Sequence, residues 1–400
     1  MTDDDDNRHK KLLCRSFHCH IMLCSQHGGL LRVSAFYFVK SFFILLKWGK
    51  YMKNIFRFLI IFILFIITSL PIYPKENMVR FAAVGDVLLD RGIRKVMEKR
   101  GMDYPLQAVS DCLNWYDLVF CNLECPLSEL GKPMEKKYIF RGDPSAVEML
   151  KKAGFNLFSL ANNHALDYGH EALVDTIDNL VNAGLYPIGA GKDQKEALKP
   201  IIIRNNGLTL AFFAVLGYPM EGVSGSPDLP GPSQTGIDEL ISLVKTIRDQ
   251  VDFIVVSFHW GIEYETQPRP QQIKDAHRLI ESGTDLIIGH HPHVIQGIEK
   301  YQGKYVLYSL GNFLFDQHDD VGKQSFLFGC TFSDEGVLFP HIIPIDIVHY
   351  QSRIATGERA DLIVNKIPLI VDEGTMSFRE ENGWYYLEEE NGQVTSMSTH

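Results

Sequence analysis

Short apolar runs alternate with segments of helical spacing from residue 78 onward. The runs read as strands buried on both faces, at residues 79–84, 117–121, 155–160, 252–258 and 285–288. Apolar positions at helical spacing fill the intervals, at residues 93–100, 105–114, 144–153, 169–183, 237–250 and 271–281. This alternation is typical of βα units around a parallel sheet. We therefore predict an α/β fold, a layered sandwich of mixed, largely parallel sheets flanked by helices.

The remaining pattern predicts hairpins, a long loop and a separate C-terminal part. Asn205-Asn206-Gly207 separates residues 200–204 from 208–215 as a tight hairpin turn. Further strands are predicted at residues 294–298 and 305–310, and a second hairpin joins 326–332 to 337–347. Residues 217–236, rich in Gly, Pro and Ser, predict a surface loop that shapes access to a site. We expect a core domain over residues 78–350, and a helix (358–366) with a β-rich tail within 351–400.

The N-terminal region has the layout of a secretory signal. Residues 52–57 form a short segment with two basic side chains, Lys53 and Arg57. An uncharged apolar run follows at residues 58–70, and then a stretch to residue 77 with two prolines and the polar residues Lys75, Glu76 and Asn77. The run is short for a bilayer span and no A-x-A cleavage pattern follows it, so a cleaved signal and an uncleaved membrane anchor both stay open. We expect residues 1–51 to be an upstream extension before a natural start at Met52; a double-anchor N-terminus is the alternative. The protein is accordingly expected at the outer face of the membrane, in the periplasm or at the cell surface.

Composition narrows the function classes. The 400 residues are 46% hydrophobic and 22% charged, as in an ordinary globular protein. A net charge of -10 provides no basic surface for nucleic acid. The cysteines beyond the leader lack the paired spacing of a zinc ribbon, and Cys121 and Cys125, which could pair, are expected to be free packing residues.

Metal-capable side chains stand at the ends of five predicted strands. They are Asp86, Glu124, Asn163 with His164, His259, and His291 with His293. Because ligands gather at the carboxyl ends of strands in α/β sheets, these side chains can converge although they are far apart in sequence. Oxygen and imidazole ligands suit manganese, iron or zinc. We expect two divalent ions here; a core histidine is the alternative at His259, and a structural role is expected for His290.

Six motifs in order resemble those of the CapA-type poly-γ-glutamate capsule biosynthesis proteins, a family similar in fold to the calcineurin-like metallophosphoesterases. They are Val84-Gly-Asp86, Asn122-Leu-Glu124, Ala161-Asn-Asn-His164-Ala-Leu-Asp167-Tyr-Gly169, His259-Trp-Gly-Ile-Glu263-Tyr264, Gly289-His-His-Pro-His293 and Ser309-Leu-Gly-Asn-Phe313. The resemblance covers about residues 78–350.

The resemblance implies a role for each site residue. Asp86 and His293 would hold one ion, while Asn163, His259 and His291 would hold the other. Glu124 would bridge the two ions. His164 would act as a catalytic group beside the substrate oxyanion or leaving group, with Asp167 orienting it. Asn122, Glu263 and Asn312 are candidate substrate contacts; a surface carboxylate and a turn-forming Asn are the alternatives for Glu263 and Asn312.

Two positions depart from the phosphoesterase pattern. Asp-x-His of the first motif is Asp86-Val87-Leu88 here, so one imidazole is missing, and Glu124 stands where an Asp is usual. No Ser or Cys nucleophile elbow and no glycine-rich nucleotide loop is present, so covalent hydrolases and kinases are not indicated.

The implied function is synthesis, export or anchoring of an anionic γ-linked glutamate polymer. Its expected partners are the polymer, other capsule-synthesis subunits and, through the N-terminal segment, the membrane. A metal-dependent phosphoesterase acting on an exported phosphate ester and a non-catalytic polymer-binding scaffold are the two alternatives.

Overall fold

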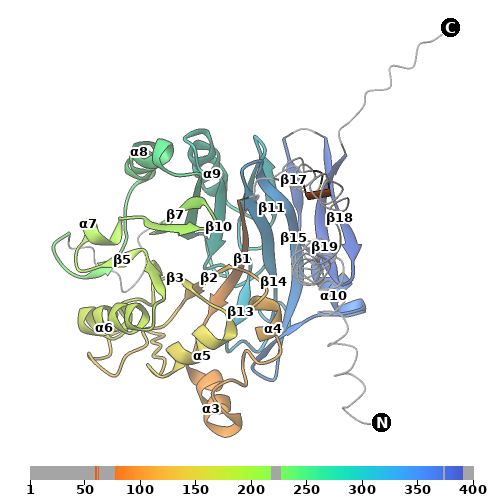
Figure 1. Cartoon of the computed structure of the whole chain (residues 1–400). Helices are drawn as coiled ribbons and strands as arrows, with labels where there is room; N and C mark the ends of the chain where they lie inside the picture. The colour runs from red at the N-terminus through yellow and green to blue at the C-terminus, as the bar shows by residue number, and fades with distance from the viewer. Residues whose placement is uncertain (1–58, 61, 63–76, 218–226, 373, 391–400) are drawn as a thin grey trace, which may run out of the picture. The chain divides into compact units, whose positions relative to one another are not determined.

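The computed structural model describes residues 59, 60, 62, 77–217, 227–372 and 374–390 (Figure 1). The chain divides into two compact units, residues 1–76 and residues 77–400, and the second contains the fold described below. The predicted upstream extension and nearly all of the predicted signal or anchor lie outside the described residues. Within the described ranges, no helix has both the length and the apolar character needed to cross a membrane.

The first sheet has a parallel half and an antiparallel half. Its strands follow the order β18 (Thr375–Glu381), β19 (Trp384–Glu390), β15 (Gly336–Val348), β14 (Gln324–Ser333), β1 (Met78–Val87), β2 (Leu118–Leu123), β3 (Leu157–Ser159) and β4 (Tyr186–Ile188). Strands β1 to β4 are parallel, whereas β14, β15, β19 and β18 continue the sheet in antiparallel pairs. Two short strands lie off this path: β13 (Asn312–Leu314) pairs with the end of β1, and β16 (Gln351–Ile354) pairs with β15.

The second sheet has a parallel centre. Its order is β17 (Leu369–Val371), β11 (Ile298–Tyr301), β12 (Lys304–Leu307), β10 (Leu286–His290), β9 (Phe253–His259), β7 (Leu208–Leu216) and β6 (Ile201–Asn205). Strands β12, β10, β9 and β7 run parallel. A small third sheet pairs β5 (Ala190–Gly191) with β8 (Gly231–Pro232).

Alternating side chains of the strands build a four-layer sandwich. In the first sheet, Phe81 and Phe120 face the second sheet and pack in one cluster with Phe212. Residues one position along, such as Ala82 and Val119, pack on the other face, where helices cover the first sheet. Those helices are α3 (Arg91–Arg100), α4 (Ser110–Leu113), α5 (Ala146–Ala153) and α6 (Gly169–Asn182). Helices α8 (Ile237–Ile247) and α9 (Pro270–Glu281) cover the second sheet from the opposite side (Figure 1). The predicted α/β layered sandwich is confirmed.

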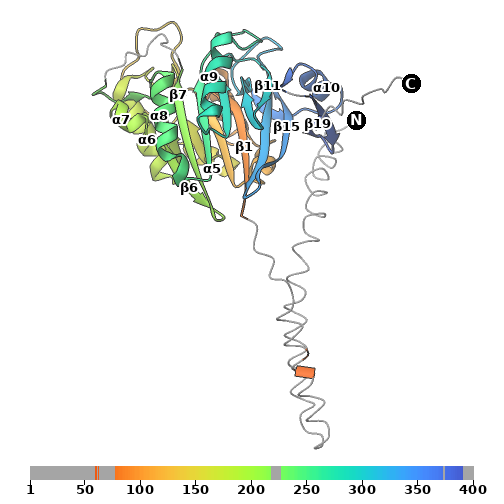
Figure 2. The ribbon, with the colours of Figure 1, turned by 90° about the horizontal axis from the view of Figure 1, so that it is seen from above.

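Several predicted elements are confirmed. The hairpin of β6 and β7 turns at Asn206 and Gly207, both with positive φ (47° and 90°), as a tight two-residue turn requires. The predicted hairpin around residues 333–336 joins β14 to β15. The β-rich tail is present as β18 and β19, and β19 pairs with β15, next to helix α10 (Glu358–Val364) (Figure 2). Cys121 and Cys125 are buried and are not joined by a disulfide, as expected of packing residues.

Other boundaries are wrong, and the reason is local. Residues 294–297 are buried but irregular. Ile295 makes only an isolated bridge to Leu310, so the strand begins at Ile298. The helix predicted at residues 105–114 is helical only over Ser110–Leu113, and turns precede it. Burial of apolar side chains therefore does not require regular backbone at either place.

Candidate metal centre

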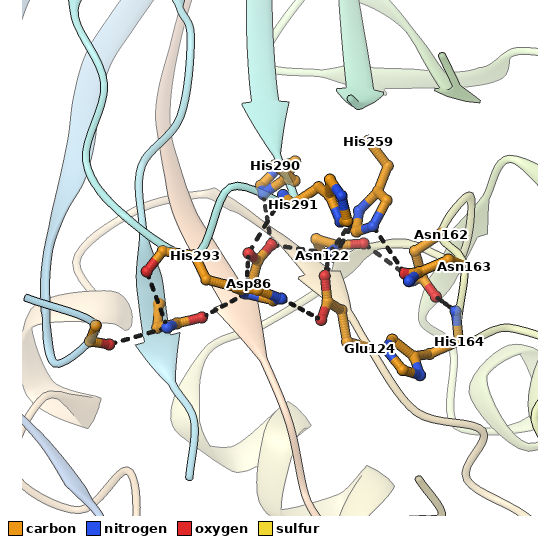
Figure 3. Close-up of polar contacts among 12 residues, drawn as sticks. Asp86, Asn122, Glu124, Asn162, Asn163, His164, His259, His290, His291 and His293 are labelled. Atoms are coloured by element: carbon orange, nitrogen blue, oxygen red, sulfur yellow. Dashed lines mark hydrogen bonds and ion pairs between the residues drawn. The ribbon is translucent and has the colours of Figure 1, made fainter. Parts of the chain in front are cut away.

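The six expected metal ligands lie at one edge of the sandwich, where strands of both sheets end (Figure 3). Asp86 lies near the end of β1 and Glu124 directly follows β2. Asn163 follows β3, and His259 ends β9. His291 and His293 follow β10. The convergence expected from the sequence is present, while the role of each residue stays a prediction.

Asn122 holds the two buried carboxylates together. Its Nδ2 donates to Oδ1 of Asp86 and to Oε1 of Glu124, each at 2.9 Å. Its Oδ1 accepts from Nδ2 of Asn162 at 3.0 Å, which joins the ends of β2 and β3. Because Asn122 is fully buried, it organises the carboxylates in this structure; the expected contact with substrate stays a prediction.

His293 faces both carboxylates through a strained turn of the backbone. His291 and His293 have φ of 97° and 58°, a region that residues other than glycine rarely adopt. The Nδ1 atom of His293 lies 2.9 Å from Oδ1 of Asn312 and 3.2 Å from Oδ2 of Asp86. Its Nε2 atom lies 3.7 Å from Oε2 of Glu124. Asn312 is fully buried, so it orients His293, and its predicted substrate contact stays a prediction.

His259 contacts the other side of the cluster. Its Nε2 lies 2.9 Å from Oδ1 of Asn163, and its Nδ1 lies 3.5 Å from Oε1 of Glu124. The ring centroid of His291 is 4.7 Å from that of His259. His290, for which a structural role was expected, has its Nδ1 3.2 Å from Oδ1 of Asp86 and is 1% exposed.

His164 and Asp167 form a buried pair that a lysine completes. The Nδ1 atom of His164 lies 2.7 Å from Oδ2 of Asp167. The backbone N–H of Phe140 donates to that same oxygen at 2.8 Å. Lys136 donates from Nζ to Oδ1 of Asp167 at 2.8 Å and to the carbonyl oxygen of Asn163 at 2.6 Å. The arrangement fixes the His164 ring and leaves its Nε2 free of these contacts.

Sequence reasoning missed Lys136 and Asn162. Lys136 stands in a polar loop between β2 and α5 that has no periodic pattern, so no signal in the sequence singles it out. Asn162 stands inside the quoted Ala-Asn-Asn-His motif, yet only its neighbours were given roles. In the structure, Asn162 accepts from the His164 backbone N–H at 3.0 Å and donates to Asn122.

Burial and charge set the protonation of the cluster. Burial alone would raise the pKa of Asp86, but hydrogen bonds and charge from His290 and His293 hold that pKa well below its usual value. Burial, reinforced by the charge of Asp86, raises the pKa of Glu124 well above its usual value. Burial would lower the pKa of His293, yet Glu124 and Asp86 raise it to about 10. Burial and the charge of His293 lower the pKa of His291 to about 3.

The donor set fits divalent cations. Two groups of three residues could each hold an ion, because the ligand atoms inside each group lie within 4.8 Å of one another. One group is Asp86, Glu124 and His259, and the other is Glu263, His291 and His293. Oε2 of Glu124 and Nδ1 of His291 are buried without a hydrogen-bond partner. A bound cation would compensate such acceptors, which otherwise lower stability. The sequence-based expectation places Asp86 and His293 on one ion, whereas these groups place them on different ions. The assignment of residues to each ion stays a prediction.

Comparisons with known proteins point to one family. The family model described as "Bacterial capsule synthesis protein PGA_cap" matches residues 80–317. The chain is 32% identical over 287 residues to the capsule biosynthesis protein CapA of Bacillus anthracis, covering 69% of this chain and 70% of that protein. It is also 32% identical over 276 residues to the PGA biosynthesis protein CapA of Bacillus subtilis, covering 68% and 73%.

Solved structures with a related arrangement are more distant. The 5'-nucleotidase precursor of Thermus thermophilus aligns with a TM-score of 0.43 at 14% identity, over 70% of this chain and 55% of that one. The NAD nucleotidase of Haemophilus influenzae aligns with a TM-score of 0.41 at 13% identity, over 75% and 58%.

Proposed function

This chain belongs to the bacterial capsule synthesis protein family, and on that premise we propose that it takes part in making, exporting or anchoring a poly-γ-glutamate type polymer at the cell surface. Two relatives named for capsule and PGA biosynthesis support the polymer, and each aligns with more than two thirds of this chain. The proposal includes the place of action and the partners. The protein would act at the outer face of the membrane, in the periplasm or at the cell surface, together with other capsule-synthesis subunits.

The observation that carries the proposed chemistry is the convergence of the six expected ligand side chains from the ends of five strands, with Glu263 beside two of them. Asp86, Glu124 and His259 would hold one ion, and His291 and His293 with Glu263 would hold a second. Asn163 would join His259, to which its Oδ1 is already hydrogen-bonded. Paired divalent ions of manganese, iron or zinc supply an ionised water and polarise an acyl or phosphoryl oxygen.

The residues around these ligands would exchange a proton with the substrate and fix the orientation of the catalytic and ligand imidazoles. His164 keeps its Nδ1 on Asp167, so its Nε2 can exchange a proton with a substrate or leaving-group oxygen. Lys136 and the Phe140 N–H satisfy Asp167 and thereby fix the orientation of the His164 ring. Asn312 holds Nδ1 of His293, which leaves Nε2 facing Glu124.

The experiment assays the purified full chain for metal content and for turnover of two substrate classes. Oligo-γ-glutamates test the polymer proposal, and phosphate monoesters and diesters test the phosphoesterase alternative. We expect bound manganese, iron or zinc and cleavage of γ-glutamyl bonds, both lost in His291→Ala. The exposed His318→Ala serves as the matched control and should retain both.

Each other outcome identifies an alternative. Turnover of phosphate esters alone would favour a phosphoesterase. Metal binding and polymer binding without any turnover would favour a scaffold. Capsule restored in a deletion strain by a His259→Ala copy would show that the site is dispensable and contradict the proposal.

A further inference from the structure

A second feature of the same edge is a cavity of about 310 Å³ beside the metal centre, here called the Lys366 cavity. Its lining residues are Thr266, Gln267, Ile295, Val321, Gln324 and Lys366. This volume is at the lower end of the range of ligand pockets, about 300–1,000 Å³. Four of the six lining residues are exposed, so the cavity opens to solvent.

Three of the segments that line the Lys366 cavity are connected to the metal centre, and Lys366 joins them through Gln324. Thr266 follows Glu263 by three residues, and Ile295 follows His293 by two. A chain segment of three residues spans at most about 11 Å, so these walls lie close to the ligands. The buried Gln296 fixes the first wall, because its Nε2 donates to the carbonyl oxygens of Glu265 at 2.8 Å and Gln267 at 3.2 Å.

The loop that supplies Val321 and Gln324 is joined to the centre as well. The carbonyl oxygen of Gly322 accepts from Nδ2 of Asn312 at 2.9 Å. Asn312 in turn contacts Nδ1 of His293 through its Oδ1. The loop that lines the Lys366 cavity is therefore connected to the metal ligand His293 by two hydrogen bonds through Asn312.

The lining has the chemistry to bind an anionic chain of amides. No acidic residue lines the Lys366 cavity within the described part of the chain, although the protein carries a net charge of -10. The Lys366 ammonium donates to Oε1 of Gln324 at 2.7 Å and makes no salt bridge with a described carboxylate. Thr266 and Gln267 have side chains without a hydrogen bond to described protein groups, so they can bind amide or carboxylate groups of a ligand.

A neighbouring cavity shows the contrast. It has a volume of about 430 Å³ and is here called the Arg359 cavity; its lining includes Asp320, Asp346, Lys323 and Arg359. There the guanidinium of Arg359 is already engaged by both aspartates, at 2.7–3.0 Å. A polyanion therefore meets a guanidinium paired with two carboxylates in the Arg359 cavity. In the Lys366 cavity it meets an ammonium without a salt bridge to a described carboxylate, whose partner Gln324 donates from Nε2 to Oδ2 of Asp320 at 2.7 Å.

We propose that the Lys366 cavity is a binding subsite for the part of the γ-linked glutamate polymer that extends beyond the metal centre. The Lys366 ammonium contacts a free α-carboxylate of the polymer, and Gln267 and Thr266 contact its amide groups. This inference rests on the proposed polymer function and adds the position at which the length of the polymer is sensed.

The test compares a γ-glutamyl dimer with a fluorescent γ-glutamyl decamer, using binding to the full chain loaded with manganese. We expect Lys366→Met to weaken decamer binding about five- to tenfold, the usual effect of losing one charge-assisted contact, and to leave dimer binding unchanged. Lys366→Arg should restore most of the affinity. The matched control is Lys323→Met in the Arg359 cavity, which should bind both oligomers like the unaltered protein.

The outcomes separate this inference from the function on which it rests. Decamer binding that is unchanged in Lys366→Met, or weakened equally in Lys323→Met, overturns the subsite and leaves the polymer function standing. Equal weakening of dimer and decamer places Lys366 at the metal centre and also overturns the subsite. An unaltered protein that binds neither oligomer contradicts the proposed function together with the subsite. Thermal unfolding of each variant confirms that it is folded.

Discussion

The Lys136 ammonium is buried against Asp167, and both side chains are nearly inaccessible to solvent (5% and 1% exposed). A lone ionised carboxylate at this depth would carry a large desolvation cost. Lys136 and the Phe140 N–H offset that cost, and His164 uses the remaining contact at Oδ2. The ion pair therefore determines how firmly the His164 ring is held.

We predict that Lys136→Met lowers the free energy of unfolding by about 3–5 kcal/mol, because it leaves the buried charge of Asp167 without its partner. The neighbouring Lys137 is exposed and lies over the Tyr138 ring, so Lys137→Met should change it by no more than about 0.5 kcal/mol. Urea unfolding monitored by circular dichroism measures both variants.

A double variant checks the cause. Adding Asp167→Asn to Lys136→Met removes the unpaired charge, so the double variant should be more stable than Lys136→Met alone. Strictly additive losses would show that Lys136 acts through packing and contradict this account.

The sequence predicts residues of this site where a regular element presents them. Asp86 and His259 close long apolar runs, so their position at a sheet edge follows from the strand pattern. Lys136 reaches Asp167 from a loop without any pattern, across 31 positions, and only tertiary packing brings the two together. Asn312 can be identified only from the motif that contains it, because β13 has three residues and is too short to be distinguished by its pattern.

At the scale of elements, β10 passes very close to the chain before β13. A Cβ atom on Gly289 would lie 2.0 Å from the carbonyl oxygen of Tyr308 and 2.6 Å from Nε1 of Trp260. That carbonyl accepts from the Trp260 indole at 3.0 Å. Strand β10 therefore requires a residue without a side chain immediately before the three histidines.

We predict that Gly289→Ala lowers the free energy of unfolding by at least about 3 kcal/mol and weakens metal binding, because backbone must shift to admit the methyl group. Gly236→Ala is the matched control: no atom lies within 4 Å of its Cβ position, and its φ is -73°. The control should stay within about 1 kcal/mol of the unaltered protein. Equal stability of the two variants would show that β10 has room that the structure does not indicate.

Strand β15 contains a buried histidine that is neutral in the folded protein. The Nδ1–H of His341 donates to the Phe339 carbonyl oxygen at 2.7 Å, and its Nε2 lies 2.8 Å from the Tyr116 hydroxyl. Burial lowers the pKa of His341 to about 4. The unfolded chain takes up the proton near the ordinary value of 6.5, so acid favours unfolding.

The resulting prediction is a loss of stability between pH 7 and pH 4. The contribution of His341 is complete above about pH 6.5 and declines as the pH falls, with a loss of about 2 kcal/mol at pH 5. His341→Gln should reduce the pH dependence of unfolding by that amount, whereas His318→Gln, at an exposed position, should not. Parallel pH profiles for the unaltered protein and His341→Gln would contradict the assignment.

Elements inside the sheets follow from the sequence more closely than those at their edges. The central strands β1, β2, β9 and β10 are buried on both faces, so their apolar runs are continuous. The start of β11 is not visible in the sequence, because Val294 and Ile295 are buried without pairing regularly. Their position is determined by the loop that carries the histidines rather than by strand preference.

At the scale of the whole molecule, two sheets meet so that acidic and imidazole groups lie together in a buried site. Asp86, Glu124, His259 and His293 are each at most 5% exposed, and the first two approach through the shared amide of Asn122. Burying these carboxylate and imidazole groups together lowers the stability of the fold unless a bound cation compensates their charge and unpaired acceptor atoms. The fold and its metals should therefore be thermodynamically linked.

The last prediction is that manganese or zinc raises the unfolding temperature more at pH 8 than at pH 6. The pKa of His293 is raised to about 10, so this imidazole holds a proton at neutral pH that a bound cation must displace, and burial together with the charge of Asp86 raises the pKa of Glu124 as well. Because the ion displaces a proton when it binds, binding strengthens as the pH rises. An ion at a hundred times its dissociation constant adds about 2.7 kcal/mol to stability. His291→Ala should lose the metal-induced shift and His318→Ala should keep it, as measured by differential scanning fluorimetry with and without chelator. If His291→Ala shows an undiminished shift, the stabilising ion binds elsewhere, and the strand ends of the two sheets do not form the metal centre.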